Sequence, residues 1–201
     1  MPAPRRNIGI VGVSSHETGF ARVTMMVHRA LRAEYPDARI TVYDELHDIT
    51  TAVRASMTHH ECNVVVSVMD WQTTARMFGM LRGTGVRTVA YSPLDTDTIH
   101  GDYLRSPRPD LTIPQTDFSA RLYREAGHRV TDTVRYDYVR FPVRSTRYAM
   151  REMLGIPADA VVYITVNDFS WRKNTPTVID AYRRLSERNT HLIVVSRGIP
   201  D

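Results

Sequence analysis

The sequence predicts an α/β protein in which helices cover both faces of a parallel sheet. Apolar, β-branched runs alternate with amphipathic runs from one end of the chain to the other, which is the pattern of repeated β-α-β units. The run at 161–166, for example, reads VVYITV and is typical of a parallel strand buried on both faces. The 201 residues suit one large domain or two small ones.

Each element follows from its own pattern. The predicted strands are about 7–14, 39–44, 63–69, 86–92, 110–114, 133–139, 161–167 and 191–196. The predicted helices are 19–34 and stretches near 50–60, 72–83, 117–126, 146–154 and 176–188. The first helix has one apolar face, formed by Phe20, Val23, Val27, Ala30 and Leu31. Gly127 and Gly155 stand where helix C-caps belong.

We expect a domain boundary near 141–145. Residues 1–142 hold enough β-α units for a complete Rossmann-like domain. Residues 143–201 read as the start of a second Rossmann-like domain that is incomplete. We therefore expect self-association through this second domain.

Composition narrows the classes of protein. No apolar run approaches the roughly 20 residues of a spanning helix, which argues against an integral membrane segment. Cys62 is the only cysteine and cannot form an internal disulfide, so a cytoplasmic protein is the default expectation. The net charge of +4 and pI near 9.4 invite a nucleic-acid role. The arginines are spread over nearly every segment without a nucleic-acid motif, so no nucleic-acid partner is predicted.

The single lysine marks the first candidate site. All other basic side chains are arginines, and Lys173 follows Arg172 just ahead of a predicted helix that carries Pro176 near its start. A lone lysine at a strand-to-helix turn suggests a position that requires a compact ammonium group. Free backbone N–H groups, the helix dipole and two cations there would favour a phosphate. A solvated Arg-Lys pair in a surface loop explains the local sequence equally well.

Other candidates follow the strands of the first domain. His16, Glu17 and Gly19 lie in the loop after the first strand, where open α/β folds bind ligands, although the glycine spacing matches neither the dinucleotide fingerprint nor a P-loop. Asp70 and Asp95 follow the third and fourth strands and would face the same edge. Asp also commonly caps a helix or turn, so that interpretation stays open for both. The pair at 59–60 lacks further ligands at metal spacing, and no metal is assigned.

Five segments carry motifs in a fixed order along nearly the whole chain. They are 18–23, 91–95, 114–119 with 125–127, 138–142, and 171–176 with 179–182. The third is similar to an S-x-F-S … E-A-G pattern, the fourth to V-D-x-x-F-P and the last to R-K-N-x-P … I-x-A-F. Together they resemble the group 1 (family 4) retaining glycosyltransferases of the GT-B fold.

The resemblance implies a glycosyltransferase, or a portion of one, that moves a sugar from a nucleoside-diphosphate sugar to an unknown acceptor with retention. Two Rossmann-like domains would face a cleft, with the acceptor on the side of His16, Gly19, Phe20, Asp70 and Asp95. Arg172 and Lys173 would contact the donor diphosphate. No catalytic residue is assigned, and no cofactor beyond the nucleotide-sugar donor is implied.

The chain also departs from the family. Asp168 stands where an arginine is usual, Ser67 to Trp71 contain no histidine, and the sequence ends before the family's Glu-x7-Glu segment. We therefore expect weak or no transferase activity from this chain alone. The alternative is a non-catalytic GT-B-like binding or structural protein, completed by another chain. An NAD-type oxidoreductase has little support.

Overall fold

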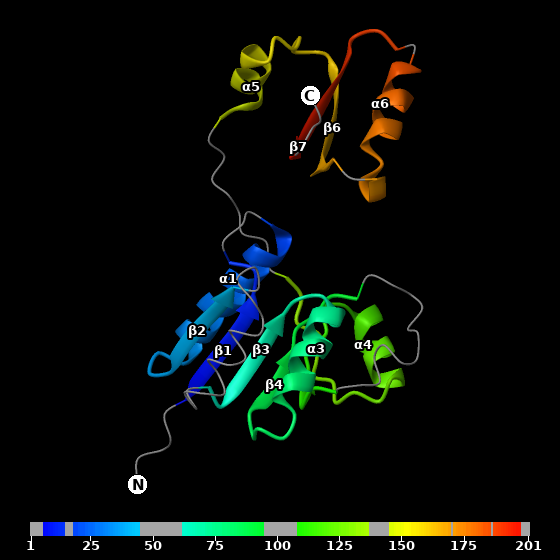
Figure 1. Cartoon of the computed structure of the whole chain (residues 1–201). Helices are drawn as coiled ribbons and strands as arrows, with labels where there is room; N and C mark the ends of the chain where they lie inside the picture. The colour runs from blue at the N-terminus through cyan, green and yellow to red at the C-terminus, as the bar shows by residue number, and fades with distance from the viewer. Residues whose placement is uncertain are drawn as a thin grey trace. The chain divides into compact units, whose positions relative to one another are not determined.

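The computed structural model describes residues 6–14, 18–44, 62–94, 108–136, 145–169, 171–185 and 187–197. The chain divides into two compact units, residues 1–138 and 139–201. Each unit pairs its strands in parallel and packs helices on the resulting sheet (Figure 1). The predicted α/β class with a parallel, helix-flanked sheet is therefore confirmed. The predicted boundary at 142/143 falls within 137–144, outside the described residues.

The first unit is a five-stranded parallel sheet in the order β2-β1-β3-β4-β5. Its strands are β1 (Asn7–Gly12), β2 (Arg39–Asp44), β3 (Val64–Val68), β4 (Arg87–Ala90) and β5 (Leu111–Thr112). Its helices are α1 (Gly19–Glu34), α3 (Trp71–Leu81) and α4 (Asp117–Glu125). The order reverses at β1, because β2 lies on one side of it and β3 on the other. The carboxyl ends of β1 and β3 are therefore the place where open α/β sheets usually bind ligands.

Helices cover both faces of this sheet. On one face, α1 contributes Val23, Val27 and Leu31 to a core with Ile10 and Val68. On the other face, α3 and α4 build a core from Val11, Val65, Trp71, Phe78 and Tyr123, among others. The rings of Trp71 and Tyr123 lie 5.5 Å apart, and the His128 ring lies 5.1 Å from Trp71. Alternate residues of β1 thus enter opposite cores, as expected for a strand buried on both sides.

The second unit contains α5 (Arg147–Met153), β6 (Val161–Asp168), a 3-10 turn η2 (Trp171–Lys173), α6 (Thr175–Arg183) and β7 (Thr190–Arg197). Strands β6 and β7 pair in parallel, with Ile164 opposite Ile193 and Val166 opposite Val195. Helix α6 packs on one face, where the rings of Tyr163 and Tyr182 lie 6.2 Å apart and the Tyr182 hydroxyl donates to the Thr190 carbonyl.

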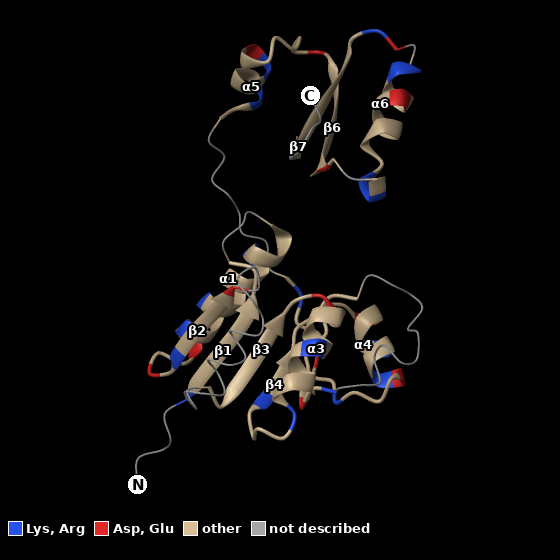
Figure 2. Ribbon diagram, viewed as in Figure 1, with Lys and Arg blue, Asp and Glu red and all other residues tan. Residues whose placement is uncertain are grey.

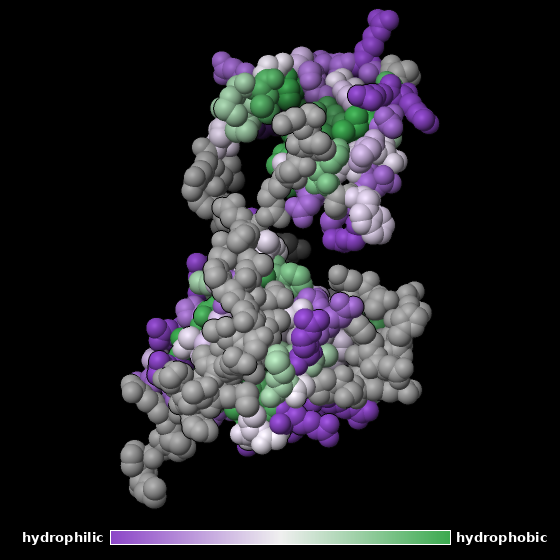
Figure 3. Space-filling view, in the orientation of Figure 1, coloured by the Kyte–Doolittle hydropathy of each residue, from purple (hydrophilic) through white to green (hydrophobic). Residues whose placement is uncertain are grey.

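The expectation that 161–166 is buried on both faces is wrong. Ile164 is 63% exposed and Val166 is 72% exposed, and Val195 opposite Val166 is 51% exposed. These side chains alternate with those that face α6, so they lie on the other face of the two-stranded sheet. Figure 3 shows hydrophobic side chains at the surface of this unit. The apolar pattern of the strand is real, but nothing described here covers this face.

Most other predicted elements agree with the structure. Helix α1 and strand β2 have the predicted bounds, and Gly127 and Gly155 adopt the predicted left-handed conformation after α4 and α5, with φ of +78° and +63°. The helix predicted near 50–60 lies outside the described residues. The described part of the predicted strand 133–139 forms no strand. Its side chains instead bond the start of α4, since Thr133 and Arg135 both donate to the Asp117 carboxylate.

Candidate functional site

The junction between η2 and α6 holds the predicted phosphate site. Strand β6 ends at Asp168, and the turn of η2 brings Arg172 and Lys173 directly before α6. Asn174 links the two elements in a left-handed conformation, with φ of 50° and ψ of 39°. Asparagine tolerates this conformation better than most residues, which explains why it stands here. The predicted strand–turn–helix arrangement around Lys173 is therefore present.

Both cations at this junction are exposed. Neither Arg172 nor Lys173 forms an ion pair or a side-chain hydrogen bond with any residue in the described part of the chain. Trp171 beside them is 91% exposed. The side chains that could bind an anion are therefore not engaged by the described residues of their unit, which leaves their charge available to a ligand.

The helix terminus itself offers fewer donors than expected. Pro176 is the second helical residue and has no N–H group. The N–H groups of Thr177 and Val178 already donate to the Asn174 carbonyl, at 3.1 and 3.4 Å. Thr175 thus carries the one first-turn N–H without an acceptor among the described residues. Two cationic side chains, rather than a set of backbone groups, would supply most of the attraction for a phosphate.

A buried hydrogen bond fixes the start of α6 to the end of β6. Thr175 is fully buried, and its hydroxyl donates to the Asn167 Oδ1 atom at 2.8 Å. The Asn167 amide in turn donates to the Thr165 hydroxyl at 2.8 Å. The sequence left open whether Asn174 or Thr175 caps α6; Asn174 is the cap residue, without a side-chain cap bond, and the buried role of Thr175 was missed. The signal was a polar Asn167 at the end of an otherwise apolar strand.

Asp70 caps α3. Its Oδ1 atom accepts from the Thr73 N–H at 3.0 Å, and the side chain is half-buried. The structure thus shows the capping role that the sequence left open, at the carboxyl edge of the first sheet. Asp95, the second predicted acid of this edge, lies outside the described residues, as do His16 and Glu17.

Gly19 and Phe20 open α1 at the same edge. Thr18 caps this helix, since its hydroxyl accepts from the Ala21 N–H at 3.1 Å. Phe20 packs with Val13 and Met69 in a small apolar cluster. A Cβ atom on Gly19 would meet no described atom within 4 Å, so close packing does not demand glycine there. The glycine required by packing is Gly12, where a Cβ atom would collide with Thr24.

Asp44 at the end of β2 is bound to the loop after β1. Its Oδ2 atom accepts from the backbone N–H of Ser14 at 3.1 Å and from the Ser14 hydroxyl at 2.8 Å. These bonds hold Ser14, two residues after the end of β1, against the end of β2. Asp44 therefore fixes the backbone at Ser14, a role that its place after β2 did not reveal.

A buried hydroxyl network lies beneath this edge. The Thr74 hydroxyl lies 2.7 Å from the Ser67 hydroxyl and 2.9 Å from the Ser92 hydroxyl, and all three residues are fully buried. The Tyr123 hydroxyl donates to the Ser92 carbonyl at 3.1 Å, and burial raises the pKa of Tyr123 so that it stays protonated. The network joins α3 and α4 to the ends of β3 and β4, and it is closed to solvent.

Metal-ligand clusters and membrane-spanning helices are both absent from the described segments. No group of three or more His, Cys, Asp or Glu side chains there is arranged to hold a metal ion. None of the helices described is both long enough and apolar enough to cross a membrane.

Comparisons with known proteins provide no family for this chain. Neither a scan against protein-family models nor a search among curated proteins finds a match. The geometry of the sites must therefore support any functional proposal by itself.

Proposed function

We propose that the second unit binds the diphosphate of a nucleotide-sugar through Arg172 and Lys173, and that the protein serves glycosyl transfer with retention from that donor. The main support is the position of Arg172 and Lys173 between a parallel strand and a helix N-terminus. Both side chains are exposed, and neither is bound by a described residue. The order of motifs along the chain supports the glycosyl-transfer part.

In this function each group has a distinct role. Arg172 offers a planar guanidinium that can donate two parallel hydrogen bonds to phosphate oxygens, and Lys173 offers a compact point charge. Their charge would stabilise the nucleoside diphosphate as it leaves the sugar. The Thr175–Asn167 bond holds the start of α6 in place, so the backbone next to both cations is fixed. The first unit would bind the acceptor near Gly19, Phe20 and Asp70.

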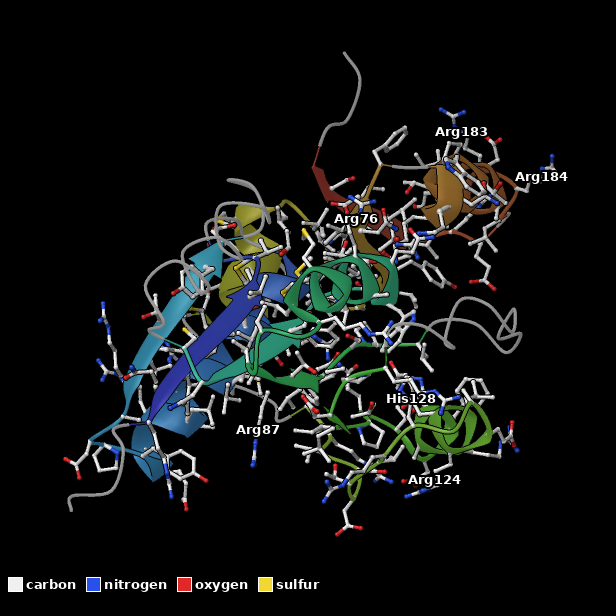
Figure 4. All side chains as sticks on the ribbon, turned by 60° about the horizontal axis from the view of Figure 1, so that its bottom comes forward. Arg76, Arg87, Arg124, His128, Arg183 and Arg184 are labelled. Atoms are coloured by element: carbon white, nitrogen blue, oxygen red, sulfur yellow. The ribbon has the colours of Figure 1, made fainter. Side chains whose placement is uncertain are left out.

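Calorimetric titration with uridine, guanosine and adenosine diphosphates tests the binding step. Lys173→Ala should weaken binding by about tenfold or more, since a charge-assisted contact contributes about 1.5–3 kcal/mol. Arg184→Ala is the matched control, because it removes one exposed positive charge from the other end of α6 (Figure 4). Equal affinity in wild type and Lys173→Ala would reject the phosphate assignment.

A second candidate function is a non-catalytic binding or structural protein with the same architecture. The exposed apolar face around Ile164, Val166 and Val195 favours it, because such faces often mark interaction surfaces. Transfer and donor hydrolysis assayed across common nucleotide-sugars separate the two functions. Robust turnover by this chain would support the transferase and exclude the non-catalytic protein.

A further inference from the structure

A pocket of about 520 Å³ lies at the amino edge of the first sheet, where β4 and β5 begin. This is the edge opposite to Asp70 and Ser92. Its charged lining residues are Arg82, Arg87, Arg108 and Asp110, and its apolar lining includes Phe78 and Leu81. Figure 2 shows basic residues at the start of β4 and on the neighbouring turn. The pocket therefore concentrates positive charge above two side chains that belong to the core of the first unit.

The acid in this lining is already engaged. The Asp110 Oδ2 atom accepts from the Thr88 N–H at 2.7 Å and from the Thr88 hydroxyl at 3.0 Å. None of the three arginines forms an ion pair with a residue that the structure describes. Three guanidinium groups and one carboxylate leave a net charge of +2 around the pocket. This charge has no partner in the described protein, and an anionic ligand would supply one.

The backbone around the pocket fixes its shape. Arg108 donates from Nη1 to the Gly127 carbonyl at 3.1 Å, and a Cβ atom on Gly127 would lie 3.1 Å from that same nitrogen. The guanidinium group thus rests against a glycine, and its remaining N–H groups have no acceptor among the described residues. Gly83 and Gly85 in the turn before β4 have φ of +81° and +80°, a conformation that favours glycine. Gly83 and Gly85 therefore line the pocket without placing a side chain in its opening.

We infer that this pocket binds a small organic phosphate. A phosphate monoester carries close to two negative charges at neutral pH, which matches the net charge of the lining. Guanidinium groups bind phosphate oxygens in pairs of parallel hydrogen bonds. The volume is within the range of small-molecule sites and exceeds what inorganic phosphate requires. Phe78 and Leu81 line the pocket but are only 3% and 2% exposed, so the organic part would contact mainly the aliphatic stems of the arginines.

This site is independent of the one at Arg172 and Lys173. All its lining residues lie between Phe78 and Asp110, within the first unit, whereas Lys173 lies in the second. Loss of one site would leave the other intact. The variants below therefore separate failure of this inference from failure of the proposed nucleotide-sugar function.

Calorimetric titration of the whole chain at low ionic strength tests the inference, with phenyl phosphate and glucose 6-phosphate as organic probes and inorganic phosphate as the comparison. Arg87→Gln is the first variant, because its exposed side chain has no described bond to lose and the fold should persist. Arg108→Gln is the second. Arg76→Gln is the matched control, since Arg76 is an exposed arginine of α3 that is not among the described lining residues of the pocket (Figure 4).

We expect an organic probe to bind wild type, and both pocket variants to weaken that binding at least tenfold. Arg76→Gln and Lys173→Ala should bind as wild type does. Thermal melts of each variant show whether the fold is kept. Absence of binding by every probe, or an equal loss in Arg76→Gln, would overturn the site. Equal affinity for inorganic phosphate would overturn the organic part of the inference.

Discussion

A methyl group at Gly12 tests how α1 packs on the first sheet. Gly12 ends β1, and an added Cβ atom would overlap the side chain of Thr24, which is fully buried on α1. Forcing a methyl group into a packed core costs about 1–3 kcal/mol. The lower entropy of alanine in the unfolded chain offsets about 0.4–1 kcal/mol of this cost, because Gly12 does not need a positive φ. We expect Gly12→Ala to lower the free energy of unfolding by about 1–2 kcal/mol.

The two tryptophans make this measurement specific to the first unit. Trp71 is 2% exposed within the core of that unit, whereas Trp171 is 91% exposed. In a Trp171→Phe background, the fluorescence change during chemical denaturation reports Trp71 alone. Gly19→Ala is the matched control, since a Cβ atom there meets no described neighbour and stability should not fall.

A double-mutant cycle identifies the cause of the loss. Thr24→Ala removes the atoms that the new methyl group would strike, together with the hydroxyl that donates to the Phe20 carbonyl. Gly12→Ala should therefore cost less in the Thr24→Ala background than in wild type, by at least about 0.5 kcal/mol. An equal cost in both backgrounds, or no cost in wild type, would refute the packing of α1 described above.

Three further predictions concern other parts of the chain. Thr175→Val should raise hydrogen-exchange rates at the start of α6, because it removes the buried bond to Asn167; unchanged rates would show that this bond does not hold the helix. The hydrogen bond from Thr133 and the charge of Arg135 hold the pKa of Asp117 below its ordinary value. These contacts therefore stabilise the fold at pH values above the pKa of Asp117 in the unfolded chain. This stabilisation is lost as the pH falls through the pKa of Asp117 in the folded protein. An NMR titration should therefore show the pKa of Asp117 rising in Thr133→Ala; an unchanged pKa would contradict this cause. The second unit should promote self-association, and Val166→Thr should reduce it in sedimentation measurements, whereas a wild-type monomer at all concentrations would exclude this role for the exposed face.

The sequence was sufficient for the elements whose local patterns agree with their surroundings. Helix α1 has an apolar face of the right period and a Thr18 cap, and its bounds were predicted correctly. Gly127 and Gly155 were recognisable because few other residues adopt their conformation. Such local signals act within a few residues, so one sequence is enough to find them.

These local sequence signals did not predict tertiary contacts. The apolar run of β6 indicated burial on both faces, but burial depends on which element covers the strand, and the described residues cover one face. The segment after Val130 has the composition of a strand, yet its side chains bond Asp117 in a different part of the chain. The pocket lined by Arg82, Arg87 and Arg108 brings together residues from α3, from β4 and from the segment before β5. The spacing of these residues along the sequence did not indicate that they meet.

At the candidate phosphate site, the sequence predicted the position of the cations but not the number of backbone donors. Arg172 and Lys173 do precede a helix in the expected way. The loss of donors arises from Pro176 together with the two bonds that the Asn174 carbonyl accepts. Proline near a helix start was visible in the sequence, whereas the bonds to the Asn174 carbonyl were found only in the structure.

The proposed contact between Lys173 and a nucleoside diphosphate can be measured directly, because of the composition of the chain. Lys173 is the only lysine, so protein labelled with ¹⁵N-lysine gives a single backbone amide resonance from this residue. Titration with uridine diphosphate should shift this resonance saturably, and Arg172→Ala should weaken the apparent affinity about tenfold. A lysine resonance that stays in place while uridine, guanosine and adenosine diphosphates are each added in excess would contradict the account.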